Sequence, residues 1–314
     1  MPIKDTITSF SRTIHREWDE VVDRLGWGSD KPVFVASYTG YGRDNYLYLT
    51  GRVLRDKAVS RNERDGLLRN VVNNFKRFNT REIPNAEVEV EWQGEKFKAT
   101  TDAEGYFKIE EHFANPFTLN VESGPWQEAK VSVVSIPGEG EIDYHTFARV
   151  SVPQQAEFGV ISDVDDTVLQ TDVTSRLKLR TMWHTIVKNA GNRRAFSNSA
   201  DFYRALQLGP DNAGENPVFY LSNSPWNLYD LLTDFLSINH FPRGPVLLRD
   251  FGLPYEERPE EYEGHKVETL RNILTAYPNL KFILLGDSGE HDTHIYLAAA
   301  REFPGRIQQV YIRD

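Results

Sequence analysis

The sequence predicts an α/β protein whose second half is a parallel sheet flanked by helices, preceded by a small β-sandwich and an N-terminal helix. From residue 158 onward, short apolar runs alternate with amphipathic segments of helical spacing, a pattern typical of parallel strands joined by helical crossovers. Between residues 84 and 152, short strands alternate apolar and charged side chains, as expected for a sandwich with one solvated face. The predicted units are residues 1–83, 84–153 and 154–314.

Of the first two units, only residues 1–83 are predicted to contain helices. An amphipathic helix is expected over residues 6–25 and a short helix over 67–78, with strands over 31–37 and 45–54 that belong with the β domain. In the sandwich, strands are expected over residues 86–92, 97–101, 106–109, 117–122, 130–135 and 145–152. The turn at Thr101 and Asp102, followed by Gly105, Tyr106 and Phe107, resembles a transthyretin-like sandwich. A partner-docking module and a plain scaffold are both open readings of it.

The third unit alternates strand and helix along its length. Strands are expected over residues 158–163, 218–222, 245–248, 281–286 and 308–312. Helices are expected near residues 177–190, 199–207, 226–237, 264–276 and 292–301. Because ligands of open α/β sheets bind at the carboxyl ends of the strands, polar residues that follow these strands are the candidates for a functional site.

Composition excludes several classes of function. The formal net charge of −10 argues against a general nucleic-acid binder, which would be basic. The chain has no cysteine, so disulfides, thiol nucleophiles and cysteine metal sites are excluded. No apolar run approaches the length of roughly 18 residues that a membrane-spanning helix needs, and the first residues lack a signal-peptide core. A cytoplasmic protein is therefore expected; the sequence does not indicate its oligomeric state.

Chemistry-bearing residues follow three of the predicted strands. Asp163, Asp165 and Asp166 follow the first, Ser222 ends the second, and Asp287 and Asp292 follow the fourth. Lys266 opens a predicted helix between the last two groups. Three carboxylates within four residues repel one another unless a cation is bound among them. Paired acids, a hydroxyl and an ammonium are the inventory needed for phosphoryl transfer.

These four pieces resemble the four motifs of the haloacid dehalogenase superfamily, in the right order and on the right elements. The strings SDVDDTVLQTDV, YLSNSPWNLY, GHK and LLGDSGEHD resemble, more narrowly, the catalytic domain of the actin-patch phosphatidate phosphatases over about residues 155–314. Asp166 stands where most of the superfamily has glycine, although the phosphatidate phosphatase group also has an acid there. The resemblance implies a Rossmann-like parallel sheet of the haloacid dehalogenase type.

The resemblance also implies the roles of the site residues. Asp163 would be the nucleophile that becomes an aspartyl phosphate, and Asp165 would be the general acid and base. The metal ligands of a Mg²⁺ site are expected to be Asp163, Asp165 through its backbone carbonyl, Asp287 and Asp292, the last directly or through water. Catalysis and substrate binding would also involve Ser222, Lys266, Thr167 and Asn223. The roles of Asp166, His265 and Ser288 stay open.

The expected function is that of a Mg²⁺-dependent phosphatase acting on phosphatidate. Two alternatives stay open: the same chemistry on a nucleotide, a nucleic-acid end or a phosphoprotein, and a binding protein in which the β-sandwich recruits a partner. A basic amphipathic segment over residues 173–200, including Arg176, Lys178 and Arg180, can be read as a peripheral membrane contact or as a solvated helix face. Asn223 and Ser224 are read either as caps of a helix begun at Pro225 or as substrate contacts. A zinc site built on His291 and His294 is disfavoured because no third neutral ligand lies nearby.

Overall fold

A computed structural model of the chain describes residues 32–55, 81–114, 116–118, 124–164, 194–210, 212, 214, 216–249, 259–288 and 292–313. The helices predicted over residues 6–25, 67–78 and 177–190 lie outside the described residues. None of the helices in the described part of the chain is long and apolar enough to cross a membrane.

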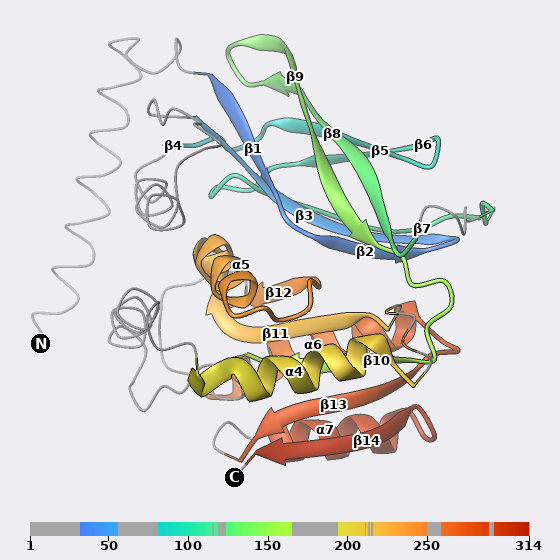
Figure 1. Cartoon of the computed structure of the whole chain (residues 1–314). Coiled ribbons are helices and arrows are strands. Elements are labelled where there is room, and N and C mark those ends of the chain that lie inside the picture. Colours follow the sequence, from blue (N-terminus) through green and yellow to red (C-terminus); the bar gives the residue numbers. More distant parts are fainter. Residues whose placement is uncertain are drawn as a thin grey trace, which may run out of the picture.

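The C-terminal half is a five-stranded parallel sheet between two helical layers (Figure 1). Its strand order is β12-β11-β10-β13-β14. The strands are β10 (Phe158–Asp163), β11 (Val218–Pro225), β12 (Val246–Arg249), β13 (Lys281–Asp287) and β14 (Ile307–Arg313). Each was predicted, and the α/β class with a parallel sheet is confirmed.

Helices bury both faces of this sheet. The helical elements are α4 (Arg194–Leu208), the short 3-10 helix η2 (Trp226–Leu228), α5 (Tyr229–Ile238), α6 (Pro259–Ala276) and α7 (Asp292–Glu302). Neighbouring residues of β10 point to opposite faces: Val160 packs in the core under α4 and α5, and Ile161 packs in the core under α6 and α7. Because β10 is buried on both faces, apolar and polar residues do not alternate along it, and its polar residues, Ser162 and Asp163, come only at its end.

The N-terminal half forms one hydrogen-bonded sheet of nine strands that folds over its own core (Figure 1). The strands are β1 (Val33–Ser37), β2 (Gly40–Arg43), β3 (Tyr46–Arg55), β4 (Arg81–Glu82), β5 (Glu87–Trp92), β6 (Glu95–Thr100), β7 (Tyr106–His112), β8 (Trp126–Ile136) and β9 (Gly140–Ser151). All described pairings are antiparallel except that of β2 with β9. The strand predicted over residues 117–122 is wrong at 117 and 118, which have no regular structure, and its remainder lies outside the described residues.

Aromatic side chains pack at the interface between the two halves. Tyr41 on β2 packs edge-on against Phe219 of β11, with ring centroids 5.5 Å apart. Tyr38 stacks on Trp226 at 4.7 Å, and the hydroxyl of Tyr277 donates to the carbonyl of Gly42 at 3.1 Å. These side chains belong to the cores of the parallel-sheet domain, so the two domains share buried apolar surface.

Candidate active site

Asp163 ends the central strand of the parallel sheet. All six residues of β10 are buried, and the side chain of Asp163 is 1% exposed. One residue further on, the N–H of Val164 donates to the carbonyl of Leu221 at 2.9 Å, so the chain stays beside β11 as it leaves the sheet. A carboxylate buried this deeply needs a positive partner, because burial alone favours its neutral form.

Lys266 on α6 supplies that partner. Its Nζ lies 2.6 Å from Oδ1 of Asp163 and 3.0 Å from Oδ1 of Asp292. The Lys266 side chain is 3% exposed, so one buried ammonium serves two buried carboxylates. The cluster keeps an excess of negative charge, which a bound cation would offset.

Asp292 begins α7 and is engaged through both of its carboxylate oxygens. Oδ1 accepts from Lys266, and Oδ2 accepts from the backbone N–H of Asp287 at 3.3 Å. Burial raises the pKa of Asp292 above its ordinary value, and the Lys266 ammonium opposes that rise. Asp292 therefore ties α6 to the end of β13, an arrangement that suits a supporting role beside a metal site.

Gly286 makes room for this contact. A Cβ at residue 286 would lie 2.5 Å from Oδ2 of Asp292 and 2.8 Å from Cε2 of Tyr296. Both atoms belong to side chains that are buried, so neither can move aside without cost. Glycine is needed here for close packing, and its backbone has no positive φ.

We expect Gly286→Ala to lower stability by about 2 kcal/mol, because overpacking a close-packed site costs on that order. The phosphatase activity expected from the sequence should fall by at least about tenfold, since Asp292 must shift from Asp287 and Lys266. Chemical denaturation and steady-state kinetics measure the two effects. Gly264→Ala is the matched control: a Cβ there meets nothing within 4 Å, so stability should stay equal or rise. Equal behaviour of the two variants would contradict the packing argument.

Ser222 lies beside Asp163 across the sheet. Leu221 on β11 is the register partner of Asp163 on β10, so Ser222 is one residue beyond it at the same edge. The Ser222 side chain is fully buried, and its Oγ accepts from the N–H of Ser224 at 2.9 Å. This bond fixes the hydroxyl oxygen at the end of the strand.

Of the two open readings of Asn223 and Ser224, the helix-cap reading does not hold for α5. β11 continues through Pro225, and α5 begins only at Tyr229, where no side-chain bond caps it. Asn223 is half-buried at this edge, and its contact with substrate stays a prediction.

Two buried tyrosines that the sequence analysis missed support the strand ends. The hydroxyl of Tyr203 on α4 lies 2.6 Å from Oγ of Ser162, which in turn donates to the carbonyl of Asp163 at 2.8 Å. The hydroxyl of Tyr296 on α7 donates to the carbonyl of Leu285 at 2.8 Å. Burial raises the pKa of both tyrosines, so both stay protonated donors. A tyrosine on an apolar helix face is so common in cores that the sequence alone gives no signal of this role.

Several predicted residues fall elsewhere. Asp165, Asp166, Thr167, His291 and the basic residues Arg176, Lys178 and Arg180 lie outside the described residues. Ser288 is exposed, and its N–H donates to the carbonyl of Arg313 at 3.0 Å. His294 is exposed on α7. His265 lines a separate cleft between the domains, although its neighbour Lys266 reaches the site.

The described donors at this edge suit Mg²⁺ better than zinc. Asp163 and Asp287 end the neighbouring strands β10 and β13 and are 1% and 5% exposed. Among the described residues, no group of three or more His, Cys, Asp or Glu side chains is arranged to hold a metal. Asp165, the expected third ligand, lies outside the described residues. Carboxylate oxygens are the ligands that hard cations prefer, so the donor chemistry fits the expected ion.

Comparison with known proteins identifies the family. A family model described as "Phosphatidate phosphatase APP1, catalytic domain" matches residues 158–314. The match begins at β10 and takes in Asp163, Ser222, Lys266, Asp287 and Asp292. The chain belongs to this family. The expected relation to phosphatidate phosphatases, and with it the expected enzyme class of phosphatase, is confirmed.

Two fungal relatives match more of this chain than the family model does. The phosphatidate phosphatase APP1 of Saccharomyces cerevisiae is 30% identical over 240 residues, which cover 75% of this chain and 39% of the yeast protein. An uncharacterized protein of Schizosaccharomyces pombe is 28% identical over 220 residues, covering 70% of this chain and 34% of that protein. The chain thus spans well under half the length of the curated relatives it matches.

The solved structures that match this chain resemble it only slightly. A carbohydrate acetylesterase from Xanthomonas citri matches with a TM-score of 0.27 and 10% identity, covering 87% of this chain and 65% of that chain. A score this low carries no information about function.

Proposed function

We propose that this chain is a Mg²⁺-dependent phosphatase of the haloacid dehalogenase type that hydrolyses phosphatidate to diacylglycerol and phosphate. The observation that supports this most is the buried Lys266 ammonium between Asp163 and Asp292, 2.6 and 3.0 Å from their oxygens. Carboxylates alone would repel a phosphate monoester, whereas a carboxylate with an ammonium beside it can approach phosphorus. The lipid substrate is taken from the name of the yeast relative.

In the first half of the proposed reaction, an oxygen of Asp163 attacks phosphorus and forms an aspartyl phosphate. The bond between phosphorus and the glycerol oxygen breaks, and Asp165 donates a proton to that oxygen, so diacylglycerol leaves as a neutral alcohol. Lys266 stays beside Asp163 and offsets the negative charge that gathers on the phosphoryl group. The hydroxyl of Ser222 bonds to a phosphoryl oxygen and orients the group, while Asn223 and Thr167 complete substrate binding.

In the second half, water attacks the phosphorus of the aspartyl phosphate. Asp165, now a carboxylate, accepts the proton from that water, and the acyl-phosphate bond breaks. Phosphate leaves and the carboxylate of Asp163 is regenerated. Residues Asp163, Asp165 and Asp287 would hold Mg²⁺, with Asp292 supporting Asp287. When bound, the ion supplies positive charge to the phosphoryl oxygens.

Removal of Mg²⁺ tests the proposed cofactor. Dialysis against excess chelator is expected to lower hydrolysis of a soluble phosphate ester by at least about a hundredfold, because the ion offsets charge worth several kcal/mol. Added Mg²⁺ should restore the rate, and added zinc should not. Full turnover in excess chelator would contradict the proposal.

A substrate panel tests the lipid. Phosphatidate in detergent micelles, lysophosphatidate, nucleotides and a chromogenic phosphate ester are compared at equal concentration by kcat/KM. The proposal expects phosphatidate to be the preferred substrate. Preference for a nucleotide or a phosphopeptide would keep the reaction and replace the substrate, and no hydrolysis of any of them would favour the binding-protein alternative.

Cytoplasmic localisation and peripheral membrane contact stay predictions from the sequence. The basic segment that motivates the contact begins outside the described residues. Replacing Arg176, Lys178 and Arg180 with glutamate is the matching test, with liposome sedimentation as the measurement and the soluble ester as the control substrate.

A further inference from the structure

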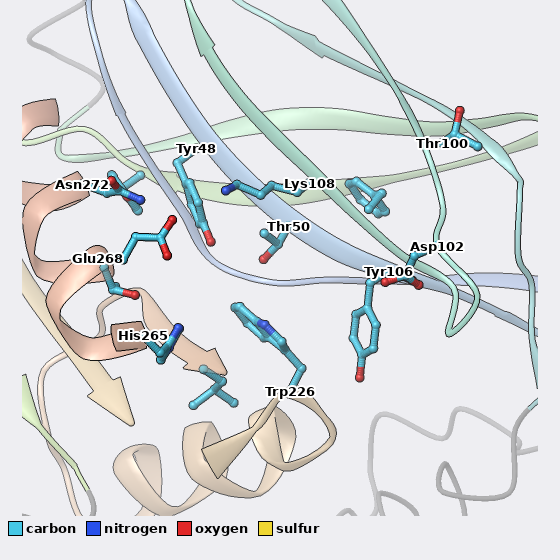
Figure 2. Close-up of a pocket in the computed structure, with 14 residues that line it drawn as sticks. Tyr48, Thr50, Thr100, Asp102, Tyr106, Lys108, Trp226, His265, Glu268 and Asn272 are labelled. Atoms are coloured by element: carbon cyan, nitrogen blue, oxygen red, sulfur yellow. The ribbon is translucent and has the colours of Figure 1, made fainter. Parts of the chain in front are cut away.

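A cleft of about 520 Å³ lies between the two domains. Strands β3 and β7 of the nine-stranded sheet form one wall, and α6 with Trp226 forms the other (Figure 2). The volume lies in the range of about 300–1,000 Å³ that small-molecule sites occupy, and such sites often lie between domains. None of the described catalytic side chains lines it.

The apolar walls of the cleft are fixed in place. Trp226 is 8% exposed and is backed by Tyr38, with stacked ring centroids 4.7 Å apart. Tyr41 is stacked against Tyr48 at 4.7 Å, and Phe107 is 2% exposed. Aromatic walls held this firmly bind a ligand at little cost in side-chain entropy.

Polar groups from both domains reach the same space. Figure 2 shows Tyr48 of β3 on one side of the cleft and Glu268 and His265 of α6 on the other, all directed into the space between them. Thr50 and Asn272 add a hydroxyl and an amide to the lining. The carboxylate accepts hydrogen bonds, whereas the hydroxyls and the amide can both donate and accept them. All of these groups lie around the aromatic wall.

His265 is a neutral member of this lining. Burial, with a smaller contribution from the positive charges of Arg249 and Lys266, lowers the pKa of His265 to about 4. Its Nε2 is buried and has no hydrogen-bond partner among the described residues. His265 therefore adds no positive charge to the lining near neutral pH.

The charges of the lining argue against an anionic ligand. Lys108 is positive, whereas Asp102 and Glu268 are negative, so the lining is negative overall and would repel an anion such as phosphate. An organic cation would seek the aromatic faces, but the chain's own cations hold two of these. Lys108 lies over the ring of Tyr48 at 5.6 Å, and Arg52 lies over the ring of Tyr106 at 4.5 Å.

We propose that this cleft binds a neutral ring that carries several hydroxyl groups, a monosaccharide or a cyclitol. Its hydroxyls would bond to the carboxylate of Glu268, the amide of Asn272 and the hydroxyl of Tyr48, while its C–H face packs on the aromatic wall. The wall is shared with the catalytic domain: α6 carries Lys266 to Asp163, and Trp226 follows the strand that carries Ser222. The occupant therefore contacts two elements that also form the catalytic edge.

Ligand-observed saturation-transfer NMR on the full chain tests the proposal. The probes are myo-inositol, glucose, galactose and N-acetylglucosamine, with choline and inorganic phosphate as charged comparisons. At least one polyol should bind saturably, and neither charged probe should displace it. Glu268→Gln and Asn272→Ala should each weaken binding by about tenfold, the equivalent of about 1.4 kcal/mol.

The control variant is Arg271→Ala on the same helix. Arg271 pairs with Glu302 outside the cleft, so its loss should leave polyol binding unchanged. The proposal is overturned by absence of binding for all four polyols, by displacement with choline or phosphate, or by equal weakening in the control. Because the readout is binding and not hydrolysis, either result is independent of the proposed phosphatase function.

Discussion

Asp163→Asn is expected to abolish phosphate release while leaving the fold intact. An amide nitrogen and a neutral oxygen cannot attack phosphorus, and loss of a nucleophile in enzymes of this kind lowers kcat by at least about a thousandfold. The amide has nearly the shape of the carboxylate, so the end of β10 keeps its packing. Lys266 also keeps a charged partner, because its Nζ lies 3.0 Å from Asp292. Steady-state kinetics on a soluble phosphate ester with Mg²⁺ measures the loss.

The same variant should be as stable as the wild type or more stable. The wild-type cluster has two buried carboxylates on one ammonium, and removing one of them relieves excess negative charge that the active site keeps for function. Asp201→Asn is the matched control, since Asp201 pairs with Arg204 on the surface of α4 and should leave activity unchanged. Activity of Asp163→Asn above a tenth of wild type, with full folding, would remove the nucleophile from the proposal.

The parallel sheet could be predicted because each strand carries a local signal. β10 has six consecutive buried residues, and it begins where the apolar run begins and continues two residues past its end, to Asp163. The edge at which the motifs meet could also be predicted, because parallel strands align their carboxyl ends. The structure adds that β10 lies between β11 and β13, which puts Asp163 beside both Ser222 and Asp287.

β2 could not be predicted, because its glycines indicate a turn in the sequence. In the structure, Gly40 and Gly42 are inside the strand, where a Cβ would lie 2.4 Å from the carbonyl oxygen of Tyr48 and 2.6 Å from that of Tyr46. These glycines serve close approach of two backbones. That contact is made only once β3 has paired with β2, so no pattern within residues 40–43 reveals it.

The packing between the two domains could not be predicted from the sequence either. Tyr41 and Phe219 are far apart in the sequence and read as ordinary core residues until the fold brings their rings to 5.5 Å. His265 and Lys266 read as one motif, yet consecutive helix residues point about 100° apart. Lys266 therefore enters the catalytic edge, while His265 lines the cleft between the domains.

Lys266→Met is expected to have the largest effect on stability. Methionine fills the volume of the lysine stem but supplies no charge, so Asp163 and Asp292 become buried carboxylates without an ammonium. Breaking a buried ion pair by removing one partner costs about 3–5 kcal/mol. Activity on the soluble ester should be lost as well, because the phosphoryl group loses the charge beside Asp163. Denaturant unfolding of the variant and of Lys281→Met, an exposed lysine at the start of β13, measures the difference.

The pH dependence of that loss identifies its cause. Burial already raises the folded-state pKa of Asp292, and the Lys266 ammonium opposes that rise, so without the ammonium the pKa of Asp292 should rise further. A raised folded-state pKa gives stability that is present at low pH and lost as pH increases. The deficit of Lys266→Met should therefore be smaller near pH 5 than near pH 8, and adding Asp163→Asn should recover part of it. A deficit that is the same at both pH values would mean that lost packing, and not uncompensated charge, explains the role of Lys266 in the fold.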